Sequence, residues 1–151
     1  MRAARFLAIA FVLAAITAVT AGSVSAGGPR ETHVAGVQLT AASPGGPQGV
    51  AYLRQRGQRL TGWIVVWGLA PGSGHAWHVH GPNGSCTGTQ RDPVASDDDL
   101  VADASGVAYV RIATTTTFQV IRRGFYVNVH ELSSEDGAGP GITCGNIRRA
   151  V

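Results

Sequence analysis

The feature that most constrains the fold of this chain is a series of short β-rich runs with turn residues between them. Glycine, proline, asparagine and serine gather at 43–47, 71–74, 81–84 and 138–141, where they favour tight turns. Beyond residue 26 no segment shows a convincing helical apolar period, so helices are not expected. The pattern predicts an all-β antiparallel sandwich or barrel of about eight strands. The runs are Val34–Leu39, Gly49–Arg54, Arg59–Leu69, Ala76–His80, Gly106–Ile112, Gly124–His130 and Ile142–Ile147.

The first 26 residues have the composition of a secretory signal peptide. Two early arginines give a basic start, Phe6–Val19 is apolar, and Ser23–Ala26 offers small residues for cleavage. The apolar run is short for a membrane-spanning helix, which needs about 20 apolar residues. An uncleaved or lipid-modified anchor is the alternative, although no cysteine lies near the cleavage site. We therefore expect cleavage after Ala26 and a secreted domain, residues 27–151, that leaves the membrane.

The net charge and the number of cysteines bear on the binding partners and on the compartment of the protein. The formal charge of +3 includes Arg2 and Arg5, so +1 remains after cleavage. No arginine-rich run with interleaved aromatic residues occurs, and we predict no nucleic-acid partner. Cys86 and Cys144 are the two cysteines of the chain. An even count in an oxidising compartment predicts a disulfide, with two buried free thiols as the alternative.

Histidines supply the main chemical signal. His75, His78 and His80 form a His-x-x-His-x-His pattern, and His130 ends a later run. Residues two apart on a strand point to the same face, so His78 and His80 are expected side by side while the valine between them faces the core. A third imidazole from another strand would complete a site for copper, zinc or iron. The alternatives are a solvated sheet face or a hydrogen-bonded pair. His33 has no partner in sequence and is expected on the surface.

Five stretches carry recognisable motifs in a single order. Gly74–His80 resembles the His-Gly-Phe-His-Val-His strand of the copper/zinc superoxide dismutase family. Val127–Glu131 is similar to that family's Val-Val-His-Glu, and Thr143–Ile147 to its closing Ala-Cys-Gly-Val-Ile. Gly84–Thr87 resembles its Gly-Cys-Thr segment, and Asp99–Ala108 its Gly-Asp-Leu, Ala-Asp, Gly-Val-Ala segment. Each match is weak alone, and the five in order make the resemblance specific.

This resemblance extends over most of Gly62–Ile147 and implies a fold, a cofactor and a substrate. The implied fold is a Greek-key barrel or sandwich with a Cys86–Cys144 disulfide. The implied cofactor is copper, and the implied substrate is superoxide. His75 matches a histidine that supports the copper site by hydrogen bonding and is not itself a ligand. The residues that match copper ligands are His78, His80 and His130.

Departures from the family pattern are equally informative. Gln90 stands where the family has its metal-bridging histidine, and no histidine occurs between His80 and His130. Asp99 matches the zinc aspartate, but one carboxylate cannot hold zinc alone, so zinc is not expected. Gly141 stands where the family has an arginine that guides superoxide to copper. Gln90, a water or a partner's residue remain the alternatives for the fourth copper position.

A neighbouring resemblance gives a further alternative. Gly124–His130 and His78–Pro82 are also similar to strands of CHRD domains, which usually lack the paired cysteines. We expect a secreted copper-binding, superoxide dismutase-like protein that dismutates superoxide with reduced efficiency. The alternatives are a non-enzymatic copper-binding or buffering protein and a CHRD-type binding module without metal. The sequence leaves the oligomeric state and the interaction partners open.

Overall fold

The computed structural model describes residues 31–149, so the expected leader, residues 1–26, lies outside the described residues. Eight strands form one antiparallel sheet in the order β6-β5-β9-β10-β1-β2-β3-β8, and β4 pairs with β7. The predicted all-β fold is therefore confirmed. The strands are β1 Thr32–Ala41, β2 Gln48–Arg56, β3 Arg59–Trp67, β4 Gly74–His75, β5 Trp77–His80, β6 Pro93–Ala95, β7 Leu100–Val101, β8 Val107–Thr115, β9 Tyr126–His130 and β10 Gly141–Asn146.

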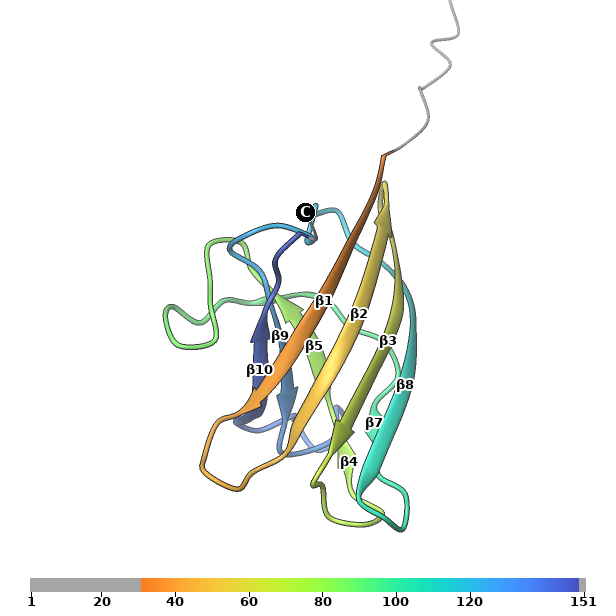
Figure 1. Cartoon of the computed structure of the whole chain (residues 1–151), viewed down its shortest axis with the longest axis vertical. Coiled ribbons are helices and arrows are strands. Elements are labelled where there is room, and N and C mark those ends of the chain that lie inside the picture. The colour runs from red at the N-terminus through yellow and green to blue at the C-terminus, as the bar shows by residue number, and fades with distance from the viewer. Residues whose placement is uncertain (1–30, 150–151) are drawn as a thin grey trace, which may run out of the picture.

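The large sheet curves until it is nearly closed into a barrel. In Figure 1, β1, β2, β3 and β8 form the near wall, and β10, β9 and β5 lie behind it. Neighbours such as β1 and β10, or β3 and β8, are far apart in the sequence, as Greek-key connections require. Within residues 31–149 there is no helix of the length and apolarity needed to cross a membrane.

Alternating side chains fill the interior of the barrel. Leu39, Leu53 and Ile64 are fully buried, and burial of each such side chain stabilises the fold by about 1.5–3 kcal/mol. Trp77 is 1% exposed, and its indole N–H donates a hydrogen bond to the carbonyl oxygen of Asp98 at 2.9 Å. The buried indole thus has a partner for its polar atom, and it fixes the loop before β7 against the start of β5.

Two short strands, β6 and β7, are not indicated by the sequence pattern. Pro93 opens β6, which lies at one edge of the sheet, where a residue without an N–H group is tolerated. The predicted strand Ala76–His80 corresponds to β5, which begins at Trp77, and the short strand β4, Gly74–His75, precedes it and was not predicted. Ala76 separates the two strands: its backbone N–H donates to the carbonyl oxygen of Leu132, and its own carbonyl oxygen accepts from the N–H of His130.

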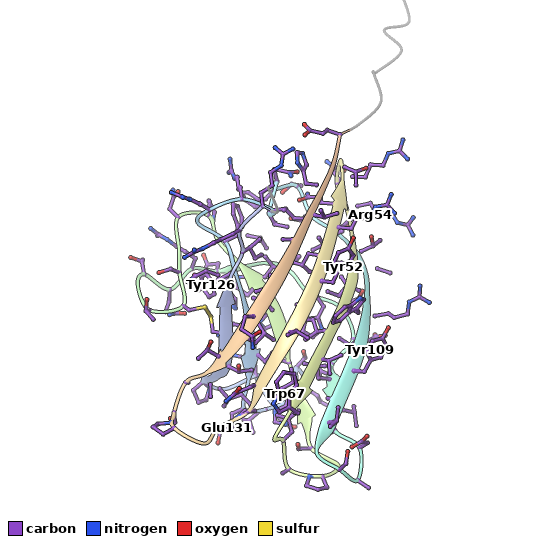
Figure 2. All side chains as sticks on the ribbon, viewed as in Figure 1. Tyr52, Arg54, Trp67, Tyr109, Tyr126 and Glu131 are labelled. Atoms are coloured by element: carbon purple, nitrogen blue, oxygen red, sulfur yellow. A yellow bond between two sulfur atoms is a disulfide. The ribbon has the colours of Figure 1, made fainter. Side chains whose placement is uncertain are left out.

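A disulfide joins Cys86, in the loop that follows β5, to Cys144 in β10. It appears as the yellow bond in Figure 2 and confirms the predicted pairing. The backbone N–H of Cys86 also donates to the side-chain oxygen of Asn146 at 3.1 Å. The loop after β5 is therefore fastened to the outer surface of the β9–β10 wall, beside the histidines described below.

Candidate metal centre

Three histidines gather where β5 and β9 run side by side. His78 and His80 lie in β5, opposite Asn128 and Tyr126 of β9. His130 ends β9 and is held level with β4 and β5 by the hydrogen bond to Ala76. One ring nitrogen from each histidine lies within 4.8 Å of the others, so these residues can hold a metal ion. The ring centroids are 4.8–5.7 Å apart.

The alternation of β5 separates these imidazoles from the core. Val79 is fully buried and packs in the barrel interior, whereas His78 and His80 face outward. Outward does not mean exposed here, because His80 is 7% and His130 is 9% exposed. The loops after β5 and after β9 cover this face, and each contributes a backbone carbonyl oxygen to a histidine.

His80 leaves one ring nitrogen available to a ligand. Its Nδ1 atom donates a hydrogen bond to the carbonyl oxygen of Arg91 at 2.6 Å. That bond fixes the tautomer, so Nε2 carries a lone pair. Nε2 is buried and has no hydrogen-bond partner. A buried polar atom without a partner is costly in an ordinary core, and coordination of a metal would satisfy it.

His130 is oriented in the same way from the other covering loop. Its Nδ1 atom donates to the carbonyl oxygen of Gly139 at 2.9 Å, which leaves the lone pair on Nε2. This Nε2 lies 3.1 Å from Nδ1 of His78, so His78 is the donor of that hydrogen bond. Nε2 of His80 and Nε2 of His130 therefore carry lone pairs for a metal, and Nδ1 of His78 would join them once its proton moves to its Nε2 atom. This donor set fits copper or zinc.

Burial favours the neutral form of two of these imidazoles, those of His78 and His80. The pKa of His78 is lowered from 6.5 to about 4, chiefly by burial and then by His130 and His80. The pKa of His80 is also lowered, again chiefly by burial. Only neutral imidazole can bind a metal, so the lowered pKa values leave ligands that few protons compete for.

His75 supports the group from behind. Its Nδ1 atom donates to the carbonyl oxygen of His130 at 2.8 Å, and its Nε2 atom lies 2.7 Å from the hydroxyl oxygen of Ser73. Both ring nitrogens are thus engaged, and His75 holds the backbone of His130 in position. Hydrogen bonding of this kind orients a neighbouring residue, and the supporting role that the resemblance implies for His75 stays a prediction.

Gln90 is connected to the histidines through Tyr126. The side-chain oxygen of Gln90 accepts a hydrogen bond from the Tyr126 hydroxyl at 3.0 Å. The Tyr126 ring stacks on His80, with centroids 5.0 Å apart and planes 8° from parallel. Gln90 itself is exposed. Sequence reasoning missed Tyr126 and Asn128, although both alternate with His130 along β9 and could have been found by that period of two.

Asp99, the residue that matches the zinc aspartate, forms hydrogen bonds with Ser134. Its carboxylate accepts hydrogen bonds from the backbone N–H of Ser134 at 2.8 Å and from the Ser134 hydroxyl at 2.6 Å. Ser134 lies in the loop between β9 and β10 that also supplies Gly139. The carboxylate therefore fixes the loop that covers His130.

Gly141 has no room for a side chain without rearrangement. A Cβ atom built there would lie 2.6 Å from the side-chain amide of Asn128. Gly141, Asn128 and Gln90 share the lining of a cavity of about 370 Å³ with the Cys86–Cys144 disulfide. Asn128 lies directly opposite His78 in the pairing of β5 with β9. The cavity therefore borders the histidine group through Asn128.

Comparison with known proteins adds no assignment: no protein-family model and no curated protein matches this chain.

Proposed function

We propose that this chain is a secreted copper-binding protein whose three-histidine centre dismutates superoxide at reduced efficiency. The observation that carries the proposal is the convergence of three imidazole nitrogens, one of which is buried without any partner. The motif resemblance to copper/zinc superoxide dismutases supports the choice of reaction. The disulfide supports export, because disulfides persist in oxidising compartments.

Copper is favoured over other divalent metals for two reasons. Nitrogen sites bind Cu(II) more tightly than Zn(II) in the general order of affinities, and the resemblance is to copper-binding strands. When bound, copper would supply one-electron redox chemistry, by which two superoxide ions and two protons become oxygen and hydrogen peroxide. His78, His80 and His130 would hold it.

The remaining residues of the site orient these ligands. The carbonyl oxygens of Arg91 and Gly139 fix the tautomers of His80 and His130, and His75 fixes the backbone of His130. Gln90 has no group that titrates near neutral pH, so it cannot deliver the protons that peroxide needs. Protons must then come from solvent, which is why the proposed activity is reduced.

Non-enzymatic copper binding is the second candidate. The observation that favours it is the engagement of Gln90 with Tyr126, which leaves three histidines without a fourth protein ligand at that position. The histidine group supports either copper function over a CHRD-type module without metal.

A metal titration followed by a rate measurement tests the proposal. The exported protein is loaded with Cu(II), bound copper is quantified, and electron paramagnetic resonance reports the nitrogen ligands. Superoxide decay is then measured by pulse radiolysis. We expect one copper per chain with nitrogen coordination and a measurable rate. Copper binding without any rate would support the buffering function, and absence of stoichiometric copper binding would contradict both.

A further inference from the structure

A second surface of the molecule lies on the opposite wall of the barrel, on the outward faces of β1, β2, β3 and β8. Four aromatic side chains on this face are 36–58% exposed. Tyr52 lies opposite Trp63 in register, and their rings stack with centroids 6.2 Å apart. Figure 2 shows Tyr52, Trp67 and Tyr109 on these strands. Grouped exposed aromatic residues mark binding surfaces. The aromatic residues are Tyr52, Trp63, Trp67 and Tyr109.

An apolar groove runs beside the stacked pair. Gly36 of β1 lies opposite Tyr52, and a Cβ atom at this glycine would meet nothing within 4 Å. The missing side chain leaves a hollow of about 370 Å³, with Val50, Tyr52 and Trp63 along its sides. The rings thus form one wall of a shallow recess instead of projecting from a flat sheet.

Arginines occupy the next rows of the same face. Arg54 lies beside Thr61, and Arg56 lies directly opposite Arg59. These residues line a hollow of about 190 Å³. Like charges placed opposite each other on neighbouring strands destabilise a sheet, so the arrangement has a cost for the fold. In Figure 2, Arg54 follows Tyr52 along β2, at the end of the face away from Trp67.

Among the described residues, Arg54, Arg56 and Arg59 form no ion pair. β1, β2, β3 and β8 contain no aspartate or glutamate. Among residues 31–149, the ion pairs are formed by His33 and Arg149 with Glu31 and do not involve Arg54, Arg56 or Arg59. Arginine donors match the oxygens of sulfate, phosphate and carboxylate groups.

We propose that this aromatic–arginine face binds an anionic polysaccharide. The apolar faces of sugar rings would stack on Tyr52 and Trp63, and anionic substituents would bind at Arg54, Arg56 and Arg59. Successive outward residues on a strand are about 6.8 Å apart, so one sugar ring and its charged substituent can reach from the aromatic row to the arginines. The proposal does not depend on the metal centre, which lies on the other wall.

The observations favour a polysaccharide over two other occupants. Tyr52, Trp63 and Trp67 are at most 39% exposed, so they lie against the sheet and do not project as membrane-inserting residues do. A second copy of the chain would bring unneutralised arginines toward a face that has no carboxylates in its strands. An anionic polysaccharide needs no inserted side chain, and it brings the negative charge that the strands of this face lack.

Binding to dextran sulfate and to neutral dextran of equal length, measured by isothermal calorimetry, tests the proposal. The exported protein should bind dextran sulfate, with an affinity that falls as salt increases, and should not bind neutral dextran. R54Q/R59Q should weaken binding by about tenfold or more, as expected for lost charge-assisted hydrogen bonds. The charge-matched control R122Q/R123Q, at two exposed arginines in the loop between β8 and β9, should change the affinity by less than about twofold.

A second variant separates sugar stacking from simple charge attraction. W63A should weaken dextran sulfate binding while the affinity for inorganic sulfate is unchanged, and copper content should be unaffected. Equal losses in R54Q/R59Q and R122Q/R123Q would overturn the proposal, since net charge alone would then explain binding. Tighter binding to phosphatidylglycerol vesicles than to dextran sulfate, or W63A behaving as wild type, would overturn it as well. The variant R54K/R59K keeps the positive charge at both positions. If it retains binding to dextran sulfate, the loss in R54Q/R59Q comes from the lost charge and not from misfolding.

Discussion

The Nδ1 atom of His78 lies 3.1 Å from the Nε2 atom of His130, across the boundary between β5 and β9. These are the same two atoms that face the candidate metal position, together with Nε2 of His80. This hydrogen bond links the two histidine strands, and a metal held by both histidines would replace it with two coordinate bonds. The strands would remain connected in either state.

Removal of any one histidine of the group should abolish tight copper binding. We expect H78A, H80A and H130A each to weaken the Cu(II) affinity by at least about 100-fold, because loss of even an outer hydrogen-bond partner commonly costs about 10- to 100-fold. Competition with a calibrated chelator measures the affinity. H33A is the control, since His33 lies in β1 outside the group. Loss of binding in H33A alone would locate the copper elsewhere.

Acidification should destabilise the metal-free protein. The pKa of His78 is about 4 in the folded chain against 6.5 ordinarily, and the pKa of His80 is also lowered. From pH 6.5 down to about 4, the unfolded chain therefore binds protons that the folded chain does not, and stability falls with pH. The urea midpoint at several pH values measures this. H78Q should show a shallower decline than wild type; parallel curves would exclude His78 as a source.

Loss of the disulfide should destabilise the fold. C86S/C144S should lower the free energy of unfolding by about 2–5 kcal/mol, because the Cys86–Cys144 bond restricts the unfolded chain. Urea unfolding with and without reductant measures the difference. In exported wild-type protein, alkylation without reductant should modify neither cysteine. A free thiol at either position in the folded, exported protein would contradict this prediction.

Superoxide dismutation should be slow, and a histidine at position 90 should accelerate it. The wild-type rate constant should lie well below the diffusion limit of about 10⁹ M⁻¹s⁻¹. Q90H adds a group that titrates near neutral pH and should raise the rate. Y126F is the matched control, because it removes the hydrogen bond to Gln90 without adding a titratable group. Equal rates in Q90H and wild type would mean that position 90 does not correspond to the family's bridging histidine.

The sequence predicts those parts of the site that depend on local periodicity. The period of two placed His78 and His80 on one face and Val79 in the core, and full burial of Val79 confirms the latter. The same period of two shows why the prediction for His33 was wrong. His33 was expected on the surface, but its side chain is 16% exposed, because it shares the inward face of β1 with Ala35.

Other parts of the site depend on contacts that no local pattern contains. The carbonyl oxygens of Arg91 and Gly139 orient two histidines, and a backbone atom carries no residue-specific signal. The convergence of His130 on β5 requires the pairing of β5 with β9, which are about fifty residues apart along the chain. Only the motif resemblance anticipated that pairing, and strand β6 was missed because it has three residues.

The hydrogen bonds from Ser134 to Asp99 have a consequence for how the protein matures. They hold the loop that presents Gly139 to His130 through the protein's own groups, and they use a carboxylate that would otherwise be available to a second metal. A metal bound by the three histidines would meet a covering loop that is already ordered, so little of its binding free energy would be needed to arrange that loop. On the proposed function, a single kind of ion would complete the protein after folding, without a second metal to shape the loop first.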